Sequence, residues 1–381
     1  MSKFLIIASY PASILKFRGA LIKAIQDKGF EIHIAAPEFN NYLEEREQLV
    51  VLGYVVHDIA MQRTGTNPKK DLKTIIELYR LMTKVKPDYV LGYTIKPVIY
   101  GSLAAKLARL PHIFALITGL GYAFSGADEV GYKKSNLQKV MHQLYAAALM
   151  TADKVFFQNP DDQALFKKMG ILKPSTPSTV VNGSGVNVSE YSVAPLPTEN
   201  DVPVPRFLLI ARLLGAKGVR EYAQAAAIIK SRHPQIQFDL VGWVDDNPDA
   251  IAQRELDAWI DDGVVSFLGK LTDVKPAIAD SSVYVLPSYR EGTPRTVLEA
   301  MAMGRAVITT NAPGCRETVI DGHNGYLVPV KDADALAEAM QKFIDEPELI
   351  VKMGRTARQV AMDKFDVNAV NQMMLMEMGI Q

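Results

Sequence analysis

The sequence predicts an α/β fold built from two doubly wound parallel sheets. Short apolar runs alternate with longer amphipathic segments over most of the chain, a pattern typical of βαβ units. A proline-rich stretch at residues 173–205 interrupts this alternation, and its composition indicates a linker. The alternation then restarts, so we predict one α/β domain on each side of that stretch.

The first half alternates between predicted strands and helices. Strands are expected at residues 3–8, 31–36, 54–57, 89–91, 113–116 and 154–158, and helices at 15–28, 43–52, 72–85, 99–108 and 137–151. The apolar run 4–8 is too short for the core of a signal peptide and indicates a buried first strand.

The second half repeats the pattern. Strands are expected at 207–211, 238–241, 264–268, 283–286 and 306–310, and helices at 220–232, 248–261, 295–303, 333–345, 346–353 and from there to 365. We predict Rossmann-like domains at residues 1–190 and 191–365 that face each other across a cleft. Ligands are then expected at the carboxyl ends of the strands. The Met-rich tail, 366–381, is predicted to be a helix that crosses back to the first domain.

Composition excludes several classes of protein. The 381 residues are 48% apolar and 22% charged and include one cysteine, as in ordinary globular chains. A single cysteine excludes a disulfide framework and a cysteine-rich metal site. No apolar run approaches the ~18 residues that a membrane span needs.

Charge is divided unevenly along the chain. Residues 1–190 carry 23 Lys and Arg against 16 Asp and Glu, a net charge of +7, and the remainder carries −7. The excess suggests that the first half meets an anionic membrane surface or a phosphorylated acceptor, although a solvated face is an open alternative. The basic residues include Arg63, Lys69, Lys70, Lys73, Arg80, Lys84, Lys86, Lys133, Lys134 and Lys139.

Two glutamates, Glu291 and Glu299, flank a predicted helix start in the second half. A strand ends at Pro287-Ser288, a polar loop follows, and Pro294 stands near the first turn of the helix. Amide groups at a helix start bind anions. One glutamate precedes the helix and the other lies about a turn inside it, so they suit two ends of a long ligand better than one metal ion.

The motif Glu291-Gly292-Thr293-Pro294-x4-Glu299 resembles the signature of family 4 retaining glycosyltransferases of GT-B fold. The segments Ala211 to Gly218, Gly269 and Asn324 to Val328 match the same family. In the first half, Ala12-Ser13-Ile14, Phe17-Arg18 and the stretch from Phe114 to Gly121 resemble one bacterial group within it. That group transfers N-acetylgalactosamine in α-1,3 linkage to undecaprenyl-diphosphate-linked bacillosamine, and related enzymes build O-antigens and capsules.

The resemblance implies a UDP-sugar donor held by the second domain. It assigns the donor diphosphate to Arg212 and Lys217, the ribose hydroxyls to Glu299, and the transferred sugar to Glu291. The backbone amides of Gly292, Thr293 and Arg295 would hold sugar and phosphate oxygens. The family needs no metal, and the adjacent pair Asp245-Asp246 lacks the D-x-D spacing of a metal site. The leaving phosphate takes the acceptor proton in the usual scheme for retaining transfer.

The first domain departs from the family pattern. Many relatives carry a histidine near the reaction centre, whereas the matching segments here contain none. We therefore predict that Lys96 and Thr118 act there, together with Glu291. Ser13 and Arg18 are candidates for the acceptor diphosphate, with a helix-surface role for Arg18 left open.

The predicted protein is a glycosyltransferase that adds a sugar, N-acetylgalactosamine in the first instance, to a polyprenyl-diphosphate-linked saccharide. The resemblance implies a peripheral position on the inner face of the bacterial inner membrane and no nucleic-acid partner. A dehydrogenase is disfavoured because Ser9 to Ser13 supplies no G-x-G-x-x-G motif. Another UDP-hexose, a soluble acceptor, or a non-catalytic nucleotide-sugar-binding protein remain alternatives.

Overall fold

The computed structural model divides the chain into two compact units, Met1–Ser184 with Val370–Gln381, and Gly185–Ala369. It describes residues 1–62, 65, 67–120, 124 and 135–381. Arg63, Lys133, Lys134 and Gly121, which entered the predictions above, lie outside the described residues. No helix in the described part of the chain has the length and apolar character to cross a membrane.

The first unit contains a seven-stranded sheet in the order β3-β2-β1-β4-β5-β6-β7, and every neighbouring pair is parallel. Its strands are β1 (Lys3–Ile7), β2 (Glu31–Ala36), β3 (Val55–Asp58), β4 (Tyr89–Tyr93), β5 (His112–Ile117), β6 (Lys154–Phe157) and β7 (Ser178–Val180). Its helices are α1 (Ser13–Asp27), η1 (Phe39–Asn41), α2 (Leu43–Val51), α3 (Pro68–Val85), α4 (Ile95–Leu107), α5 (Asn136–Leu149), α6 (Pro160–Lys168) and most of α13 (Val367–Glu377).

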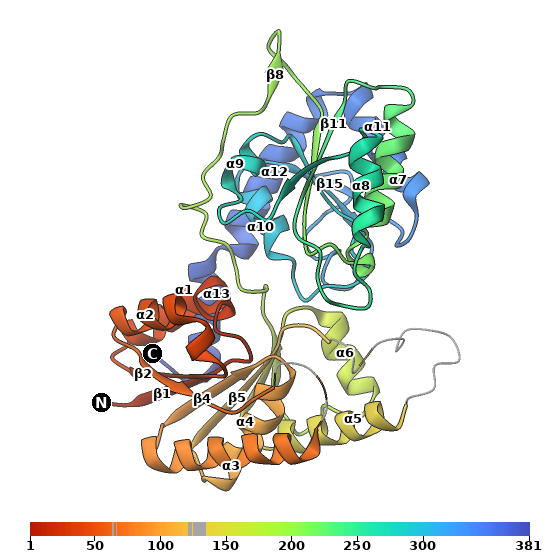
Figure 1. Ribbon diagram of the computed structural model, residues 1–381. Helices are drawn as coiled ribbons and strands as arrows, with labels where there is room; N and C mark the ends of the chain where they lie inside the picture. Colours follow the sequence, from red (N-terminus) through yellow and green to blue (C-terminus); the bar gives the residue numbers. More distant parts are fainter. Residues whose placement is uncertain (63–64, 66, 121–123, 125–134) are drawn as a thin grey trace. The chain divides into compact units, whose positions relative to one another are not determined.

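Alternation along β1 builds the two cores of this unit. Leu5 and Ile7 pack with α3, α4 and α5, which lie together on one face of the sheet (Figure 1). Phe4 and Ile6 point to the opposite face and pack with α1, α2 and α13. Since successive side chains of a strand point to opposite faces, a run with no polar residue is what a doubly covered sheet requires.

The second unit contains a six-stranded parallel sheet in the order β12-β11-β10-β13-β14-β15. Its strands are β10 (Arg206–Ile210), β11 (Gln237–Val241), β12 (Ser266–Gly269), β13 (Val283–Leu286), β14 (Ala306–Thr310) and β15 (Gly325–Val328), preceded by the hairpin β8 (Thr198–Glu199) and β9 (Val202–Pro203). Its helices are η3 (Gly215–Lys217), α7 (Val219–Lys230), α8 (Gln253–Asp261), α9 (Lys275–Ala279), α10 (Arg295–Ala302), α11 (Ala333–Asp345) and α12 (Glu348–Phe365).

The predicted fold class is confirmed, since both units are doubly wound parallel sheets. The prediction missed β7, β15, α6 and α9, and several boundaries differ, such as that of the helix expected at 72–85, which begins at Pro68. The helix expected at 248–261 begins at Gln253, because residues 249–251 pair with the loop 213–215 through Gly215 N–Asp249 O (2.8 Å) and Ile251 N–Leu213 O (2.9 Å). Residues 348–365 form one helix, and the helix expected at 99–108 begins at Ile95.

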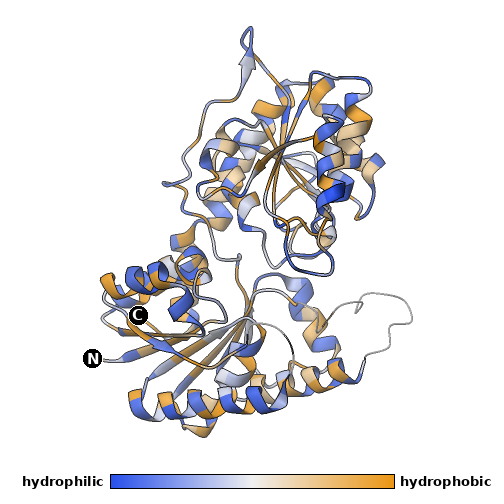
Figure 2. Ribbon diagram, in the orientation of Figure 1, coloured by the Kyte–Doolittle hydropathy of each residue, from blue (hydrophilic) through white to orange (hydrophobic). Residues whose placement is uncertain are grey.

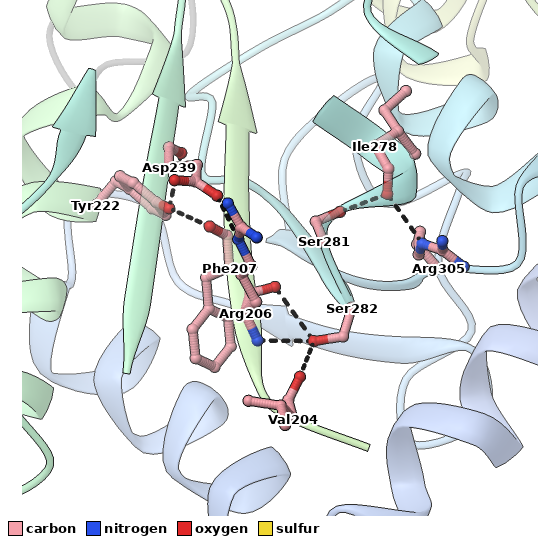
Figure 3. Close-up of polar contacts among 9 residues, drawn as sticks. All are labelled: Val204, Arg206, Phe207, Tyr222, Asp239, Ile278, Ser281, Ser282 and Arg305. Atoms are coloured by element: carbon pink, nitrogen blue, oxygen red, sulfur yellow. Dashed lines mark hydrogen bonds and ion pairs between the residues drawn. The ribbon is translucent and has the colours of Figure 1, made fainter. Parts of the chain in front are cut away.

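A polar network ties the amino ends of β10 and β13 together in the second unit (Figure 3). Ser282 Oγ donates to Val204 O (2.8 Å) and lies 2.7 Å from the Arg206 amide, and Arg206 Nε donates to Asp239 at 2.8 Å. Arg305 is fully buried, and its Nε donates to Ile278 O at 3.0 Å. The Ser282 bonds join the amino ends of β10 and β13, and the candidate site lies at the opposite ends of these two strands.

Candidate active site

The strand order of the second unit reverses between β10 and β13, and the loops after these strands carry the predicted donor residues. β10 pairs with β11 on one side and β13 on the other. Connections therefore leave in opposite directions at their carboxyl ends, which opens a crevice where ligands of such sheets bind. Arg212 and Lys217 follow β10, and Glu291 and Glu299 follow β13.

Close backbone packing brings these two loops together. Gly218 has φ 71°, and a Cβ there would overlap the carbonyl oxygen of Pro287. Only glycine combines this conformation with such an approach. The Tyr289 amide also donates to Ala216 O at 3.0 Å. The loop after β10 therefore rests directly on the loop after β13.

Lys217 and Glu291 form an ion pair across these loops. The ammonium of Lys217 contacts Glu291 Oε1, which also accepts from Ser288 Oγ at 2.8 Å. The Glu291 amide donates to Pro313 O at 2.9 Å, and a Cβ on Gly314 would overlap Glu291 O. Lys217 and Ser288 thus hold the carboxylate, the contacts with residues 313–314 hold the backbone, and 15% of the Glu291 side chain is exposed.

Glu299 lies in the second turn of α10 and is almost enclosed, with 3% of the residue exposed. Arg295, one turn earlier, donates from Nε to Glu299 Oε1 at 2.7 Å. Tyr191 hydrogen-bonds to the same carboxylate, and burial followed by the Glu299 charge raises the pKa of Tyr191. The sequence singled out only the backbone amide of Arg295, whereas its side chain orients the predicted ribose ligand.

Arg212 is the most open of the four, with 40% of its side chain exposed. Its Nη1 donates to Asp245 at 3.0 Å. Asp245, considered above only as a poor metal ligand, is therefore the arginine's partner. The Trp243 carbonyl accepts from the Leu213 amide at 3.1 Å, which keeps the Asp245 segment beside the loop after β10.

All four predicted charged donor ligands thus lie on one carboxyl edge, each in contact with a group of opposite charge. Gly292, Thr293 and Arg295 stand at the start of α10 on the same edge. A guanidinium and an ammonium beside a helix start form a site for a diphosphate. Buried carboxylates next to it can accept hydroxyl hydrogen bonds.

The first unit has a second polar cluster at its own reversal point, between β1 and β4. Ser13 Oγ donates to Tyr10 O at 2.6 Å and lies 3.0 Å from the Tyr93 hydroxyl. The Arg18 guanidinium lies 5.5 Å from the centre of the Tyr93 ring. Burial raises the pKa of Tyr93 to about 12, against the opposing effects of Ser13 and Arg18.

Arg18 is 4% exposed, so a helix-surface role is excluded. Gln158, directly after β6, accepts from Arg18 Nη2 and donates to Thr118 O, both at 3.2 Å, in the amide orientation that satisfies both neighbours. Ser13, Arg18 and Thr118, predicted from separate segments, therefore belong to one cluster.

Lys96 contacts a residue outside this cluster, Asp71 of α3. It is 7% exposed and its Nζ donates to Asp71 of α3 at 2.9 Å. A buried ion pair between α3 and α4 argues for a structural tie, because removing either partner would leave an uncompensated charge. This position does not support the predicted role of Lys96 at the reaction centre.

Sequence reasoning missed Tyr93, Gln158, Tyr191 and Ser288. Two simple signals were available, since Tyr93 ends a strand and Gln158 directly follows one, where ligands of parallel sheets bind. Tyr191 had no local signal, because it lies in the linker and meets Glu299 only in the folded chain.

Two family models match the chain, one in each half. The model of group 1 glycosyl transferases matches residues 204–346, and that of glycosyl transferase 4-like proteins matches residues 11–159. The first match contains all six strands of the second sheet and the predicted donor residues. The second match contains β2 to β6 of the first sheet, with Ser13, Arg18 and Thr118.

The chain belongs to the group 1 glycosyltransferases.

This retaining glycosyltransferase is similar along its length to a Campylobacter jejuni protein, N,N'-diacetylbacillosaminyl-diphospho-undecaprenol alpha-1,3-N-acetylgalactosaminyltransferase. The two are 29% identical over 95% of this chain and 94% of the relative. The Escherichia coli UDP-Gal:alpha-D-GlcNAc-diphosphoundecaprenol alpha-1,3-galactosyltransferase is 27% identical over 78% of this chain and 76% of its own.

Solved structures agree on the fold. The Anabaena protein HepE in complex with UDP and glucose superposes with a TM-score of 0.79 at 20% identity and covers 100% of both chains. Sucrose-phosphate synthase from Thermosynechococcus elongatus gives a TM-score of 0.78 at 20% identity, over 99% of this chain and 98% of its own. The glycosyltransferase therefore has the predicted GT-B fold.

Proposed function

We propose that this glycosyltransferase moves N-acetylgalactosamine from a UDP donor to a saccharide carried on a polyprenyl diphosphate. The similarity to the Campylobacter jejuni transferase, which extends over both units, carries the proposal. The Escherichia coli relative supports the acceptor class, because its name also specifies a diphosphoundecaprenol-linked sugar. The two relatives differ in the sugar that they transfer, so the donor sugar is the finer part of the proposal.

The donor occupies the edge formed by the loops after β10 and β13. Its diphosphate lies against Arg212, Lys217 and the amides of Gly292, Thr293 and Arg295 at the start of α10. Charge grows on this diphosphate as the glycosidic bond breaks, and fixed cations stabilise that charge. Donor binding draws Lys217 toward the phosphates and leaves Glu291 able to accept from sugar hydroxyls. Glu299, oriented by Arg295, accepts from the ribose hydroxyls.

The acceptor diphosphate binds near Ser13 and Arg18, at the carboxyl edge of the first sheet. Thr118 contributes from the loop after β5. In transfer with retention, the acceptor oxygen forms a bond to the anomeric carbon while the bond from that carbon to the UDP oxygen breaks. The acceptor proton passes to the leaving phosphate, so the step requires no protein base, and Arg212 and Lys217 supply positive charge to the leaving diphosphate.

The lipid-linked acceptor implies that the enzyme works at a membrane, at the inner face of the bacterial inner membrane. The basic excess of residues 1–190 supports an anionic lipid surface as a partner. The experiment that tests the function is a donor panel. Purified enzyme is incubated with UDP-N-acetylgalactosamine, UDP-N-acetylglucosamine, UDP-galactose or UDP-glucose and a polyprenyl-diphosphate-linked saccharide, and products are measured by mass spectrometry.

We expect a product one N-acetylhexosamine heavier with the first donor, at a rate at least tenfold above the others. Preference for another UDP-hexose would overturn the donor assignment alone. Transfer to free sugars at the same rate would overturn the lipid-linked acceptor. UDP binding without any transfer would indicate a non-catalytic binding protein.

A further inference from the structure

One helix of the first unit, α3, presents an unusual solvent face. Its buried side, which includes Thr74, Leu78 and Met82, packs into the unit. On the outer side, Leu72, Ile76 and Tyr79 remain 57%, 40% and 41% exposed. These residues are spaced i, i+4 and i+7, so they form one continuous apolar stripe along the helix.

Basic residues line the side of the helix next to this stripe. Lys69, Lys73, Arg80 and Lys84 follow at spacings of four, seven and four residues, and all are exposed. Figure 2 shows hydrophilic and hydrophobic residues alternating along α3.

Of the two acidic residues of α3, Glu77 pairs with one lysine of this face and Asp71 pairs with a buried lysine elsewhere. Asp71 is the partner of buried Lys96, and its side chain is 14% exposed. Glu77 accepts from the Ala60 amide at 2.7 Å and lies 3.6 Å from Lys73. The exposed charge on α3 is therefore predominantly positive.

We propose that the outer face of α3 docks on an anionic lipid bilayer, with Leu72, Ile76 and Tyr79 inserted at the interface and the adjacent basic residues facing the headgroups. An apolar stripe beside lysines is what binds helices parallel to a membrane surface. A nucleic acid would use the charges but gains nothing from exposed leucine and isoleucine. The aromatic ring of Tyr79 suits the interface, where one end of the side chain is apolar and the other wet. The inference deepens the proposed function and rests on its lipid-linked acceptor.

Vesicle flotation tests the surface. The full chain is mixed with vesicles of phosphatidylglycerol and phosphatidylcholine, or of phosphatidylcholine alone, without donor or acceptor. We expect binding to the anionic vesicles to exceed binding to the neutral ones at least tenfold and to weaken as salt is raised. L72S/I76S/Y79S and K69Q/K73Q/R80Q/K84Q should each reduce binding at least tenfold.

The matched control is V351S/M362S, which removes two apolar residues of α12 that are each 37% exposed. It should bind vesicles as the unchanged protein does, and thermal unfolding checks that every variant folds. Equal flotation of L72S/I76S/Y79S and the unchanged protein, or equal binding to neutral vesicles, would overturn the proposal. So would binding to single-stranded DNA in preference to anionic vesicles.

A second measurement separates this inference from the proposed function. Transfer to a short-chain, water-soluble analogue of the lipid acceptor needs no membrane, so the α3 variants should retain it within about twofold. Transfer to the analogue without vesicle binding would remove the docking surface and leave the function standing. Vesicle binding without transfer to the analogue would overturn the proposed function and leave the docking surface standing.

Discussion

Glu299 is the most enclosed of the predicted donor ligands: 3% of the residue is exposed, and Arg295 Nε donates to its carboxylate at 2.7 Å. A hydrogen bond to a charged acceptor contributes about 1.5–3 kcal/mol. We expect Glu299→Gln, and likewise Arg212→Ala, to weaken UDP binding and lower kcat/KM at least tenfold. Titration calorimetry and steady-state kinetics measure the two effects.

The control for this change is Glu255→Gln, which breaks an ion pair between Glu255 and Arg220 at 2.7 Å. It removes the same charge without touching the predicted donor ligands, so UDP affinity should stay within about twofold. Unchanged UDP affinity in both Glu299→Gln and Arg212→Ala would remove the donor-site assignment.

Arg305 acts on stability. It is fully buried, and its guanidinium donates all five N–H groups to backbone carbonyls of Ile278, Ala194, Met303, Pro195 and Ala279. Burial lowers its pKa to about 10, which still leaves it charged at neutral pH. Lysine has three donors and no planar fork, so Arg305→Lys leaves carbonyls unpaired.

Lysine leaves two of the five carbonyls without a donor, at about 1–3 kcal/mol each. We therefore expect Arg305→Lys to lower the free energy of unfolding by about 2–6 kcal/mol, measured by urea denaturation. Arg232→Lys, at an exposed position, should change it by less than about 0.5 kcal/mol. Equal unfolding midpoints for the two variants would contradict the structural role given to Arg305.

Strand pairing joins two histidines in the first unit, His33 of β2 and His57 of β3. His33 Nδ1 lies 2.9 Å from His57 Nε2, and the rings stack with centroids 5.2 Å apart. Burial, His33 and Lys84 lower the pKa of His57 to about 4, and burial lowers that of His33 despite Glu31. Both rings are therefore neutral at pH 7 in the folded chain.

A histidine whose folded pKa is depressed takes up its proton preferentially in the unfolded chain. Above pH 6.5 neither state of the chain protonates this ring, so the ring does not affect stability. As pH falls from 6.5 to about 4, proton uptake by the unfolded chain lowers the free energy of unfolding, with a slope of up to about 1.4 kcal/mol per pH unit. We expect His57→Gln to flatten the pH dependence of the urea midpoint between pH 7.5 and 5. His323→Gln, at an exposed site, should leave that dependence unchanged.

The sequence predicts elements well where burial dictates them. The run from Phe4 to Ile7 has no polar residue because helices cover both faces of its sheet. The prediction was wrong at residues 249–251, which were expected to be helical and instead pair with the loop after β10. Such pairing depends on contacts between distant segments, which periodicity does not register.

In the candidate site, too, single residues were predictable from the sequence and contacts between distant segments were not. The resemblance of their segments to family motifs singled out Arg212, Lys217, Glu291 and Glu299, and the structure places all four on one carboxyl edge. Their pairing was not predicted, because Lys217 and Glu291 are 74 residues apart and meet only through the packing of Gly218 on Pro287. Lys96 shows the converse: it was predicted in place of the histidine that many relatives carry, and its burial against Asp71 argues for a structural role.

At the scale of the whole molecule, the end of the chain belongs to the unit that contains its beginning. Residues 370–381 leave the second unit and complete the core of the first, where Met374, Leu375, Met378 and Ile380 are buried. Glu377 forms an ion pair with Lys154, the first residue of β6, and this lysine lowers the pKa of Glu377. The tail therefore closes one face of the first sheet.

Two methionines of this tail make a matched pair. Met374 is 1% exposed and Met376 is 68% exposed. Replacing a buried methionine by alanine costs about 2–5 kcal/mol, since it removes apolar contacts and leaves a cavity, whereas an exposed one costs little. We expect Met374→Ala to lower the free energy of unfolding of the first unit by that amount, and Met376→Ala to change this free energy by less than about 0.5 kcal/mol.

Hydrogen exchange measures the effect strand by strand. In Met374→Ala, exchange should rise in β1, β2 and β4 and stay unchanged in β10 and β13, because the second unit has its own cores. Equal exchange in the two variants would show that the tail contributes nothing to the first unit, and faster exchange in both sheets would show that the units unfold together.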